Sequence, residues 1–462
     1  MTLDPSRTVR DPGSFRDPSG QIFHRNGRIF RSVSPAAAED FAALRDSGLL
    51  AELTAHGLLI ESEEADRALL GDQAGQAALL LEHPRLSFVS YPYEWPFALL
   101  QQAALLHLDL QLRALERNFA LSDATAYNVQ FRAGRPVFID LLSLRPYREG
   151  EFWAGYKQFC EQFVNPLALR SKLGVPHNDW YRGSLEGLTA RDLAPLLKLR
   201  HKLSFNVFSH IVLQARVGAA SDREDTAKLQ ALRDKGLSKT RYRALLQALR
   251  SWIAGLKARP VAPGAARPQI LEAESAVRAF AAEVNPNQLW ALGCGDGALA
   301  TAALDAGAGE VIGFEADPDL LEAAAARGHG RALLPLYLPP ANPSPGQGWN
   351  GAERKSLAAR RSADALLALG AVQELAIGHN IPLAEAVAWL IGLAPRGLVD
   401  FAGKEDSEVR RRLLLREDIF PDYQEARFRD LLSQAAEIEA EETLPSGRTL
   451  FRYRRKPAAE KE

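Results

Sequence analysis

The chain has 462 residues, of which 47% are hydrophobic and 24% charged, and its formal net charge at pH 7 is −1. A chain of this length is expected to form two or three domains, and a net charge this small excludes the strong field that attracts nucleic acid or anionic lipid. Two cysteines, Cys160 and Cys294, are too few for a disulfide framework. Because no apolar run is as long as a membrane span and residues 1–20 do not resemble a signal peptide, we expect a cytoplasmic protein with no membrane span and no nucleic-acid partner.

The N-terminal half mixes strand and helix patterns. Residues 28–33 and 85–90 predict strands, residues 91–95 predict a turn, and the apolar run at 96–118 predicts a long buried helix. We therefore predict an α+β domain over residues 1–255.

Three polar residues after the long helix have a distinctive spacing. Asn128 follows Asp123 by five residues, and Asp140 follows Asn128 by twelve. Spacing alone also fits ordinary turn capping. In this context of strands and a buried helix, the set resembles the catalytic loop and metal-binding Asp of kinase-like phosphotransferases. That resemblance implies that Asp123 orients an acceptor hydroxyl, while Asn128 and Asp140 hold magnesium on nucleotide phosphates.

Other features of this half depart from a working kinase. The first lysine is Lys157, so a phosphate-pairing lysine is missing from the first strands, where Arg31 is the nearby substitute. The first hundred residues contain no G-x-G-x-x-G loop, and Leu141 and Leu142 follow Asp140 in place of Phe-Gly. We expect a degenerate kinase-like domain without phosphoryl transfer, and nucleotide binding stays open as an alternative.

The boundary between the two halves is marked by composition. Residues 219–239 are charged and predict a solvated segment, and residues 240–256 predict an amphipathic helix. Residues 256–268 contain three prolines and predict an extended linker. A second domain is expected over residues 269–457.

The second half opens with a strand–turn–helix–strand unit. Its predicted parts are a strand at 289–292, a turn containing Gly293, Gly295 and Gly297, a helix at 298–308 and a strand at 311–314. The glycines let the backbone turn sharply and approach a ligand at the helix N-terminus. Glu315 ends the second strand, where a carboxylate can accept the hydroxyl protons of a ribose. The unit predicts nucleotide binding.

Two cofactor classes fit this turn. Read as G-x-G-x-x-A, with Ala298 as the last residue, it suits a dinucleotide. Read as G-x-G-x-G, it resembles the first motif of class I S-adenosylmethionine-dependent methyltransferases. The sequence after residue 289 is long enough for one such domain, and a further substrate domain is not evident. The sequence therefore favours the methyltransferase.

The rest of the chain alternates strands and helices. We predict helices at 318–327, 383–393 and 425–435, and strands at 332–338, 363–369, 397–402, 436–443 and 449–453. This order predicts a doubly wound, Rossmann-like α/β sheet of seven strands that ends in an antiparallel pair.

Several longer motifs narrow the resemblance. They are NPSPGQGW at 342–349, ERKSLAARRSADALLALGAV at 353–372, NIPL at 380–383, WLIGLAPRG at 389–397 and LREDIFPDY at 415–423. Together they resemble a bacterial methyltransferase family that includes nodulation-protein-like members. The resemblance covers almost the whole chain and implies S-adenosyl-L-methionine as the cofactor. It leaves the acceptor open among small molecules, glycans and lipids.

The methyltransferase interpretation supplies the candidate site. It assigns cofactor binding to Gly293, Gly295, Asp296, Gly297, Glu315, Asn342 and Gln373. Glu374 is the candidate catalytic base if the acceptor has to lose a proton. Ala291 stands where such enzymes usually carry an acid, and Pro339 and Pro340 stand where a polar residue commonly meets adenine. No metal site is expected, because Cys and His are not clustered.

Three functions remain open on the sequence. The first is an S-adenosylmethionine-dependent methyltransferase. The second is a kinase-like phosphotransferase or nucleotide-binding protein that uses the N-terminal half. The third is a cofactor-sensing or scaffold protein built from two catalytically weakened folds.

Overall fold

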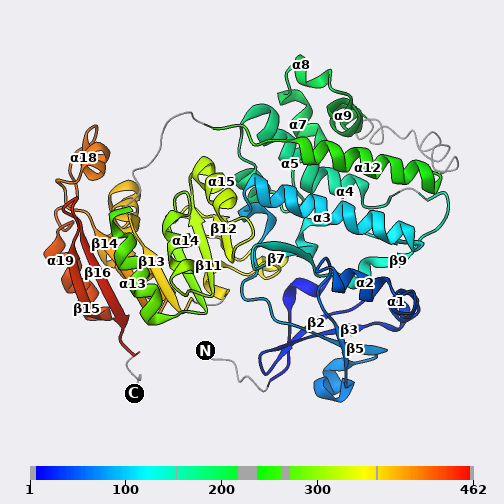
Figure 1. Cartoon of the computed structure of the whole chain (residues 1–462), viewed down its shortest axis with the longest axis horizontal. Coiled ribbons are helices and arrows are strands. Elements are labelled where there is room, and N and C mark those ends of the chain that lie inside the picture. The colour runs from blue at the N-terminus through cyan, green and yellow to red at the C-terminus, as the bar shows by residue number, and fades with distance from the viewer. Residues whose placement is uncertain (1–6, 152, 217–236, 262–270, 361–362, 458–462) are drawn as a thin grey trace. The chain divides into compact units, whose positions relative to one another are not determined.

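A computed structural model describes residues 7–151, 153–216, 237–261, 271–360 and 363–457. The chain divides into two compact units, and each is described by itself (Figure 1). Unit 1 comprises Met1–Val261 and Gln347–Arg354, and unit 2 comprises Ala262–Gly346 and Lys355–Glu462. Most of the charged segment predicted at 219–239 and of the linker predicted at 256–268 lies outside the described residues.

Unit 1 begins with an antiparallel sheet in the order β1-β2-β3-β5-β4. The strands are β1 (Val9–Arg10), β2 (Ile22–Arg25), β3 (Arg28–Val33), β4 (Glu63–Ala65) and β5 (Leu79–His83). Asn26 and Gly27 join β2 to β3 with φ values of 50° and 76°, as a two-residue hairpin turn requires. The strand predicted at 28–33 is confirmed.

The strand predicted at 85–90 is wrong. The structure forms β5 at Leu79–His83, and residues 84–90 contain no strand. Pro84 explains the difference, because proline lacks the N–H that would continue the ladder. The apolar run that precedes it pairs with β3 instead, with Leu81 opposite Arg31.

Two long helices pack together in unit 1. The predicted buried helix is α3 (Phe97–Glu116), and α12 (Lys239–Gly255) lies against it (Figure 1). Gln111 on α3 donates a hydrogen bond of 2.6 Å from Nε2 to the Tyr242 hydroxyl on α12. Gln111 Oε1 also accepts from the backbone N–H of Leu121 at 2.7 Å, so the buried amide is satisfied on both sides.

Shorter elements complete unit 1. Two antiparallel pairs follow α3: β6 (Phe119–Leu121) pairs with β9 (Leu144–Pro146), and β7 (Val129–Arg132) pairs with β8 (Arg135–Phe138). The remaining α-helices are α1 (Pro35–Asp46), α2 (Leu49–Ala55), α4 (Tyr156–Phe159), α5 (Asn165–Ala168), α6 (Asn178–Gly183), α7 (Ala190–Leu196), α8 (Leu199–Lys202) and α9 (Phe205–Val207).

Unit 2 is built on a seven-stranded sheet in the order β12-β11-β10-β13-β14-β16-β15. The strands are β10 (Gln288–Leu292), β11 (Glu310–Glu315), β12 (Leu333–Tyr337), β13 (Ala365–Ala368), β14 (Arg396–Phe401), β15 (Ala436–Thr443) and β16 (Thr449–Arg455). The first five are parallel, and β16 runs antiparallel to both of its neighbours. The predicted Rossmann-like sheet with a closing antiparallel pair is confirmed.

The strand order places a switch point at the centre of the sheet. The chain runs outward from β10 through β11 to β12, then returns to the other side of β10 at β13. The carboxyl ends of parallel strands meet at one edge, and ligands bind there at such a switch point. The helices of unit 2 are α13 (Glu274–Val284), α14 (Ala298–Asp305), α15 (Pro318–Arg327), α16 (Ala371–Gln373), α17 (Leu383–Leu393), α18 (Ser407–Leu413) and α19 (Glu425–Ala435).

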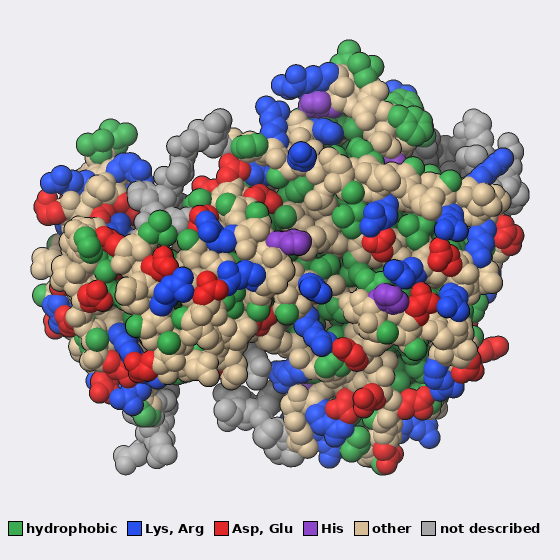
Figure 2. All heavy atoms as spheres, in the orientation of Figure 1, with side chains coloured by type: hydrophobic (Ala, Val, Ile, Leu, Met, Phe, Trp, Pro, Cys, Tyr) green, Lys and Arg blue, Asp and Glu red, His purple; other side chains and the backbone are tan. Residues whose placement is uncertain are grey.

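Acidic and basic side chains are interspersed on the visible face of the molecule (Figure 2). This mixture agrees with the net charge of −1. Among the described residues, no helix combines the length and apolar character needed to cross a bilayer.

Candidate functional site

The glycine turn after β10 has a backbone conformation that favours glycine, and hydrogen bonds hold it in place. Gly293, Gly295 and Gly297 have φ values of 67°, 58° and 82°, which residues with a Cβ rarely adopt. The backbone N–H of Cys294 donates to the carbonyl of Phe314 at 3.0 Å, and that of Gly297 donates to the carbonyl of Cys294 at 3.0 Å. The turn is therefore fixed to the end of β11.

Glu315 is the buried acid at this turn. Glu315 is only 3% exposed, and its Oε2 accepts a hydrogen bond of 2.9 Å from the backbone N–H of Gly295. Oε1 accepts from the backbone N–H groups of Ala316 and Asp317, each at 2.8 Å. These bonds place the carboxylate beside the glycine turn, at the sheet edge where the sequence predicted a ribose contact.

Asp296 and Gly297 start helix α14. Asp296 Oδ1 accepts from the backbone N–H of Ala298 at 2.9 Å, and Oδ2 pairs with Arg327 at 2.5 Å. A Cβ on Gly297 would lie 3.2 Å from the Leu333 side chain and 3.3 Å from Ala324. Gly297 thus lets the start of the helix pack closely on its neighbours.

The cysteine inside the turn faces the sheet. A Cβ on Gly313 in β11 would lie 2.9 Å from Cys294 Sγ, so the thiol fills the space that this glycine leaves. Burial raises the pKa of the Cys294 thiol well above its ordinary value. A buried protonated thiol is a poor nucleophile, and Cys294 is a packing residue.

The turn and the carboxylate fit an adenosyl cofactor, whereas other predicted positions fit it less closely. Gly293 in the turn is exposed, the turn leads into the N-terminus of α14, and the Glu315 carboxylate lies beside it. Ala291 is a buried residue of β10 and offers no carboxylate. Asn342 lies exposed in the segment after β12, following Pro339 and Pro340.

The end of β13 lies next to the glycine turn. Ala368 is paired with Leu292 in the sheet, and a Cβ on Gly293 would lie 3.4 Å from the carbonyl oxygen of Leu369. Gln373 follows in α16, is fully buried, and has no hydrogen-bond partner within the described structure at either Nε2 or Oε1. The structure therefore places this predicted site residue at the switch point.

Glu374, the predicted base, is engaged by two positively charged or chargeable groups. One carboxylate oxygen pairs with Arg412, and the other lies 3.1 Å from His379 Nε2. Its proposed role as a proton acceptor stays a prediction.

A network of ion pairs behind α16 was not found from the sequence. Arg448 lies 3.1 Å from Asp400, 2.8 Å from Asp406 and 3.2 Å from Glu408. Glu408 also pairs with Arg412 at 2.9 Å. Burial raises the pKa of Asp400, while Arg448 opposes this shift. No local sequence pattern predicts this network, because its members come from the ends of different strands and helices.

The three polar residues singled out in unit 1 come together. Asn128 donates hydrogen bonds from Nδ2 to Asp123 Oδ1 at 3.1 Å and to Asp140 Oδ2 at 3.2 Å. Arg31 lies 2.6 Å from Asp140 and 2.5 Å from Asp17. The sequence indicated Arg31 as the cation of this region, but it did not indicate Asp17 as its partner.

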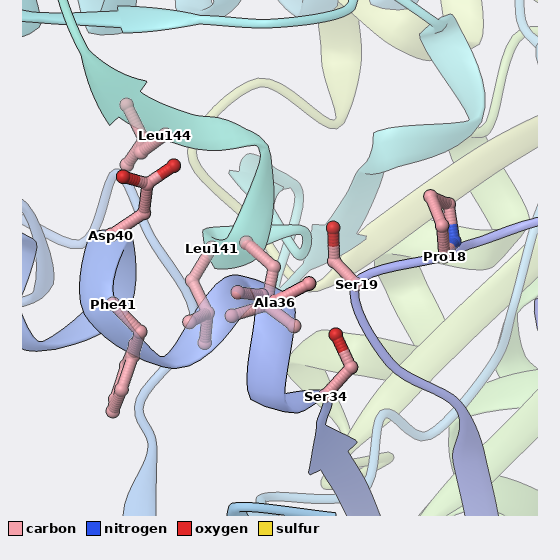
Figure 3. Close-up of a pocket in the computed structure, with 10 residues that line it drawn as sticks. Pro18, Ser19, Ser34, Ala36, Asp40, Phe41, Leu141 and Leu144 are labelled. Carbon is pink, nitrogen blue, oxygen red and sulfur yellow. The ribbon is translucent and has the colours of Figure 1, made fainter.

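Asp123 has an unusual electrostatic environment. Burial raises the pKa of its carboxyl from 3.8 to about 7, and the neighbouring charge of Asp140 adds to this shift. A cavity of about 150 Å³ is lined by Leu141 and Leu142, which directly follow Asp140 in the chain, together with Ser19 and Ser34. Figure 3 shows these serine hydroxyls and Asp40 around an otherwise apolar lining.

The segment Gln347–Arg354 belongs to unit 1, although it falls between β12 and β13 in sequence. The Arg354 guanidinium lies 4.0 Å from the centre of the Tyr127 ring, and Glu353 pairs with Arg16 at 2.7 Å. Gln347 Nε2 donates to the carbonyl of Arg182 at 3.0 Å.

Comparison with known sequences gives one extensive match. The chain is 45% identical to the nodulation protein NoeA of Rhizobium meliloti (strain 1021), over an alignment of 462 residues that covers 97% of each chain. No family model matches the sequence.

Solved structures give weaker likenesses. The N-methyltransferase NodS from Bradyrhizobium japonicum WM9 is 11% identical, matches 40% of this chain and 97% of its own, and has a TM-score of 0.28. The 16S rRNA methyltransferase RmtF in complex with S-adenosyl-L-homocysteine is 16% identical, matches 52% of this chain and 72% of its own, and has a TM-score of 0.26. TM-scores this low carry no argument about what the chain binds or does.

Proposed function

The chain belongs to the family of the nodulation protein NoeA, and on this premise we propose that it is an S-adenosylmethionine-dependent methyltransferase. The observation that carries the proposal is the hydrogen bond between Gly295 and Glu315 at the switch point of the sheet. It ties a glycine turn of positive φ to a buried carboxylate, and this is the pair of features that an adenosine ribose needs. We propose a small molecule, glycan or lipid as the acceptor.

Unit 2 would hold the cofactor mainly through its backbone. S-adenosylmethionine, when bound, supplies an electrophilic methyl group on a sulfonium. The turn from Gly293 to Gly297 would hold the ligand close to the start of α14, and Glu315, which lies beside this turn, would accept hydrogen bonds from the ribose. The chain's own contribution is then to hold donor and acceptor in line and to exclude water. A dedicated base is not required for that, and Glu374 is the candidate where the acceptor must lose a proton.

Calorimetry on the full chain tests this proposal. We expect S-adenosylhomocysteine and S-adenosylmethionine each to bind at one site per chain. Thermal unfolding should shift upward with either ligand, because a ligand that binds only the folded state stabilises it. Failure of both ligands to bind would exclude the methyltransferase and favour the scaffold alternative.

We also propose that unit 1 has a kinase-like fold that binds a nucleotide without transferring its phosphate. The observation in favour is that Asn128 bridges Asp123 and Asp140. One ion pair argues against phosphoryl transfer. Arg31 already pairs with Asp140, the residue that would hold magnesium under the resemblance, and thereby competes with a metal for that carboxylate.

A thermal shift experiment separates these possibilities. The full chain would be heated with ATP plus magnesium, with ATP plus EDTA, and with S-adenosylhomocysteine. Stabilisation by ATP in both media supports a nucleotide site in which Arg31 replaces the metal. Stabilisation only with magnesium would show that the metal displaces Arg31, and no shift with ATP would exclude nucleotide binding.

A further inference from the structure

Gln373 is a buried amide that has no hydrogen-bond partner among the described residues. It is the last residue of α16, its exposed fraction is 0%, and within the described structure neither Nε2 nor Oε1 has a hydrogen-bond partner. Native proteins pair almost all of their buried polar groups, so each exception calls for a specific explanation. Gln111, equally buried, has partners for both atoms and shows what a structural glutamine looks like in this chain.

Gln373 follows the end of a central strand, the edge of a doubly wound sheet at which ligands bind. It lies four residues after Leu369, whose carbonyl oxygen approaches the glycine turn at Gly293. Strands β10 and β13 meet here at the switch point of the sheet, where ligands bind in doubly wound folds. A π-helical turn, Glu374–Gly378, follows directly, and such turns are frequent at functional sites.

The segment that carries Gln373 is held on both sides. Before it, the backbone N–H of Gly370 donates to Asp400 at 2.6 Å. After it, Glu374 pairs with Arg412. Arg448 and Glu408 connect these two contacts through the ion pairs of the network. Because the segment is tied at both ends, the lack of a partner for Gln373 is not explained by a loose loop.

The chemistry presented at this point is that of a neutral amide. The carboxylates next to this point already have cationic partners: Glu374 pairs with Arg412, and Asp400 pairs with Arg448. A charged acceptor would be buried here without its own counter-charge, which is unfavourable. A hydroxyl suits the amide on both sides, since it donates to Oε1 and accepts from Nε2.

We propose that Gln373, which the sequence interpretation assigned to the cofactor, instead binds the methyl acceptor through its amide. We also propose that the group methylated is an uncharged hydroxyl, on a free small molecule or on a glycan. This inference rests on the proposed methyltransferase function. In the reaction, a carbon–oxygen bond to the hydroxyl forms as the carbon–sulfur bond of the donor breaks. The products are a methyl ether and S-adenosylhomocysteine, and the hydroxyl proton passes to water.

The first test needs no acceptor. Gln373→Leu replaces the amide with an apolar side chain of similar size, so the melting temperature of the full chain should stay equal or rise. Gln111→Leu is the matched control and should lower it, because it leaves the Tyr242 hydroxyl and a backbone N–H without their partners. A fall with Gln373→Leu as large as that of the control would show that the amide already has a structural partner, such as a buried water, and would overturn the proposal.

The second test identifies the acceptor class. The wild type and Gln373→Leu would be incubated with S-adenosylmethionine labelled in its methyl group and a polar extract of cells that lack the gene, divided into free small molecules and glycans. We expect Gln373→Leu to reduce labelling by about 30-fold while its affinity for S-adenosylhomocysteine stays within about threefold of the wild type. The fraction that takes up label tells a free hydroxyl compound from a glycan.

The stability of the label distinguishes the acceptors. A methyl ether keeps its label in alkali and passes through a cation exchanger, and this result supports the proposal. Label released by alkali as volatile methanol indicates an ester, and label retained on the exchanger indicates an amine; either result overturns it. So does a wild type that binds S-adenosylhomocysteine but labels nothing in either fraction. Loss of S-adenosylhomocysteine binding by the wild type itself would instead refute the proposed function.

Discussion

Gly295 and Glu315 are joined by a hydrogen bond of 2.9 Å from the backbone N–H of the glycine to Oε2 of the acid. The two residues come from the ends of neighbouring parallel strands, β10 and β11. One carboxylate therefore fixes the shape of the glycine turn and also lies where a ribose is expected. This double role makes the cofactor affinity and the local stability of unit 2 depend on the same side chain.

Glu315→Gln should weaken the binding of S-adenosylhomocysteine and also destabilise the protein. The carboxylate accepts hydrogen bonds from three backbone N–H groups, and an amide has only one oxygen with which to replace them. We expect a loss of about 1–3 kcal/mol in binding free energy. Calorimetry measures this loss at a temperature where the variant is still folded, and an unchanged affinity would place the ribose elsewhere.

Gly295→Ala should abolish cofactor binding at a modest cost in stability. Gly295 has a φ of 58°, and an alanine in this region costs about 1–2 kcal/mol. Gly330→Ala is the matched control, since Gly330 has a φ of 75° and a Cβ there meets no atom within 4 Å. Both variants should lose similar unfolding free energy by urea titration. Equal loss of S-adenosylhomocysteine affinity in both would argue against a ligand at the turn.

Asp123→Asn should stabilise the protein at neutral and higher pH. Burial raises the pKa of Asp123 to about 7 from 3.8, so the folded state holds its proton more tightly than the unfolded state does. The stability that this proton contributes is complete below about pH 4 and is lost as the pH rises through about 7. The variant does not titrate, and its advantage over the wild type should therefore grow with pH.

Urea unfolding at about pH 5 and about pH 8 measures this change, which is at most about 3 kcal/mol over that interval. Asp72→Asn serves as the control, because Asp72 is an exposed carboxylate of the same unit. If the unfolding free energies of the wild type and Asp123→Asn differ by the same amount at both pH values, Asp123 is not protonated near neutral pH.

Arg448→Met should be strongly destabilising. It leaves the carboxylate of Asp400, which has 0% of its side chain exposed, without its cation. Loss of one partner of a buried ion pair costs about 3–5 kcal/mol. Combining it with Asp400→Asn should recover part of this loss, as a double-mutant cycle in urea would show.

Arg454→Met provides the surface comparison for that experiment. Arg454 pairs with Glu437 at 2.9 Å and with Glu439 at 3.1 Å, and more than half of the Arg454 side chain is exposed. Exposed pairs of this kind contribute about 0–1 kcal/mol. Similar losses for Arg448→Met and Arg454→Met would mean that water reaches the network around Asp400.

The sequence by itself determined the seven strands of unit 2 and four of its helices, whereas it did not predict α13, α16 or α18. The helices predicted at 318–327, 383–393 and 425–435 have those bounds in the structure, because a periodic apolar stripe and flanking proline or polar residues are local properties. The glycine turn could also be predicted from the sequence, because backbone positions with positive φ favour glycine.

Only the tertiary structure decided which side chains meet. The sequence placed a strand six residues too late in the region of β5, because pairing with β3 outweighed local propensity. The sequence did not predict that Arg31 pairs with both Asp17 and Asp140, or that Arg448 pairs with Asp400. These contacts join segments that are distant in the chain, and their strength comes from shared burial, which no local pattern of residues records.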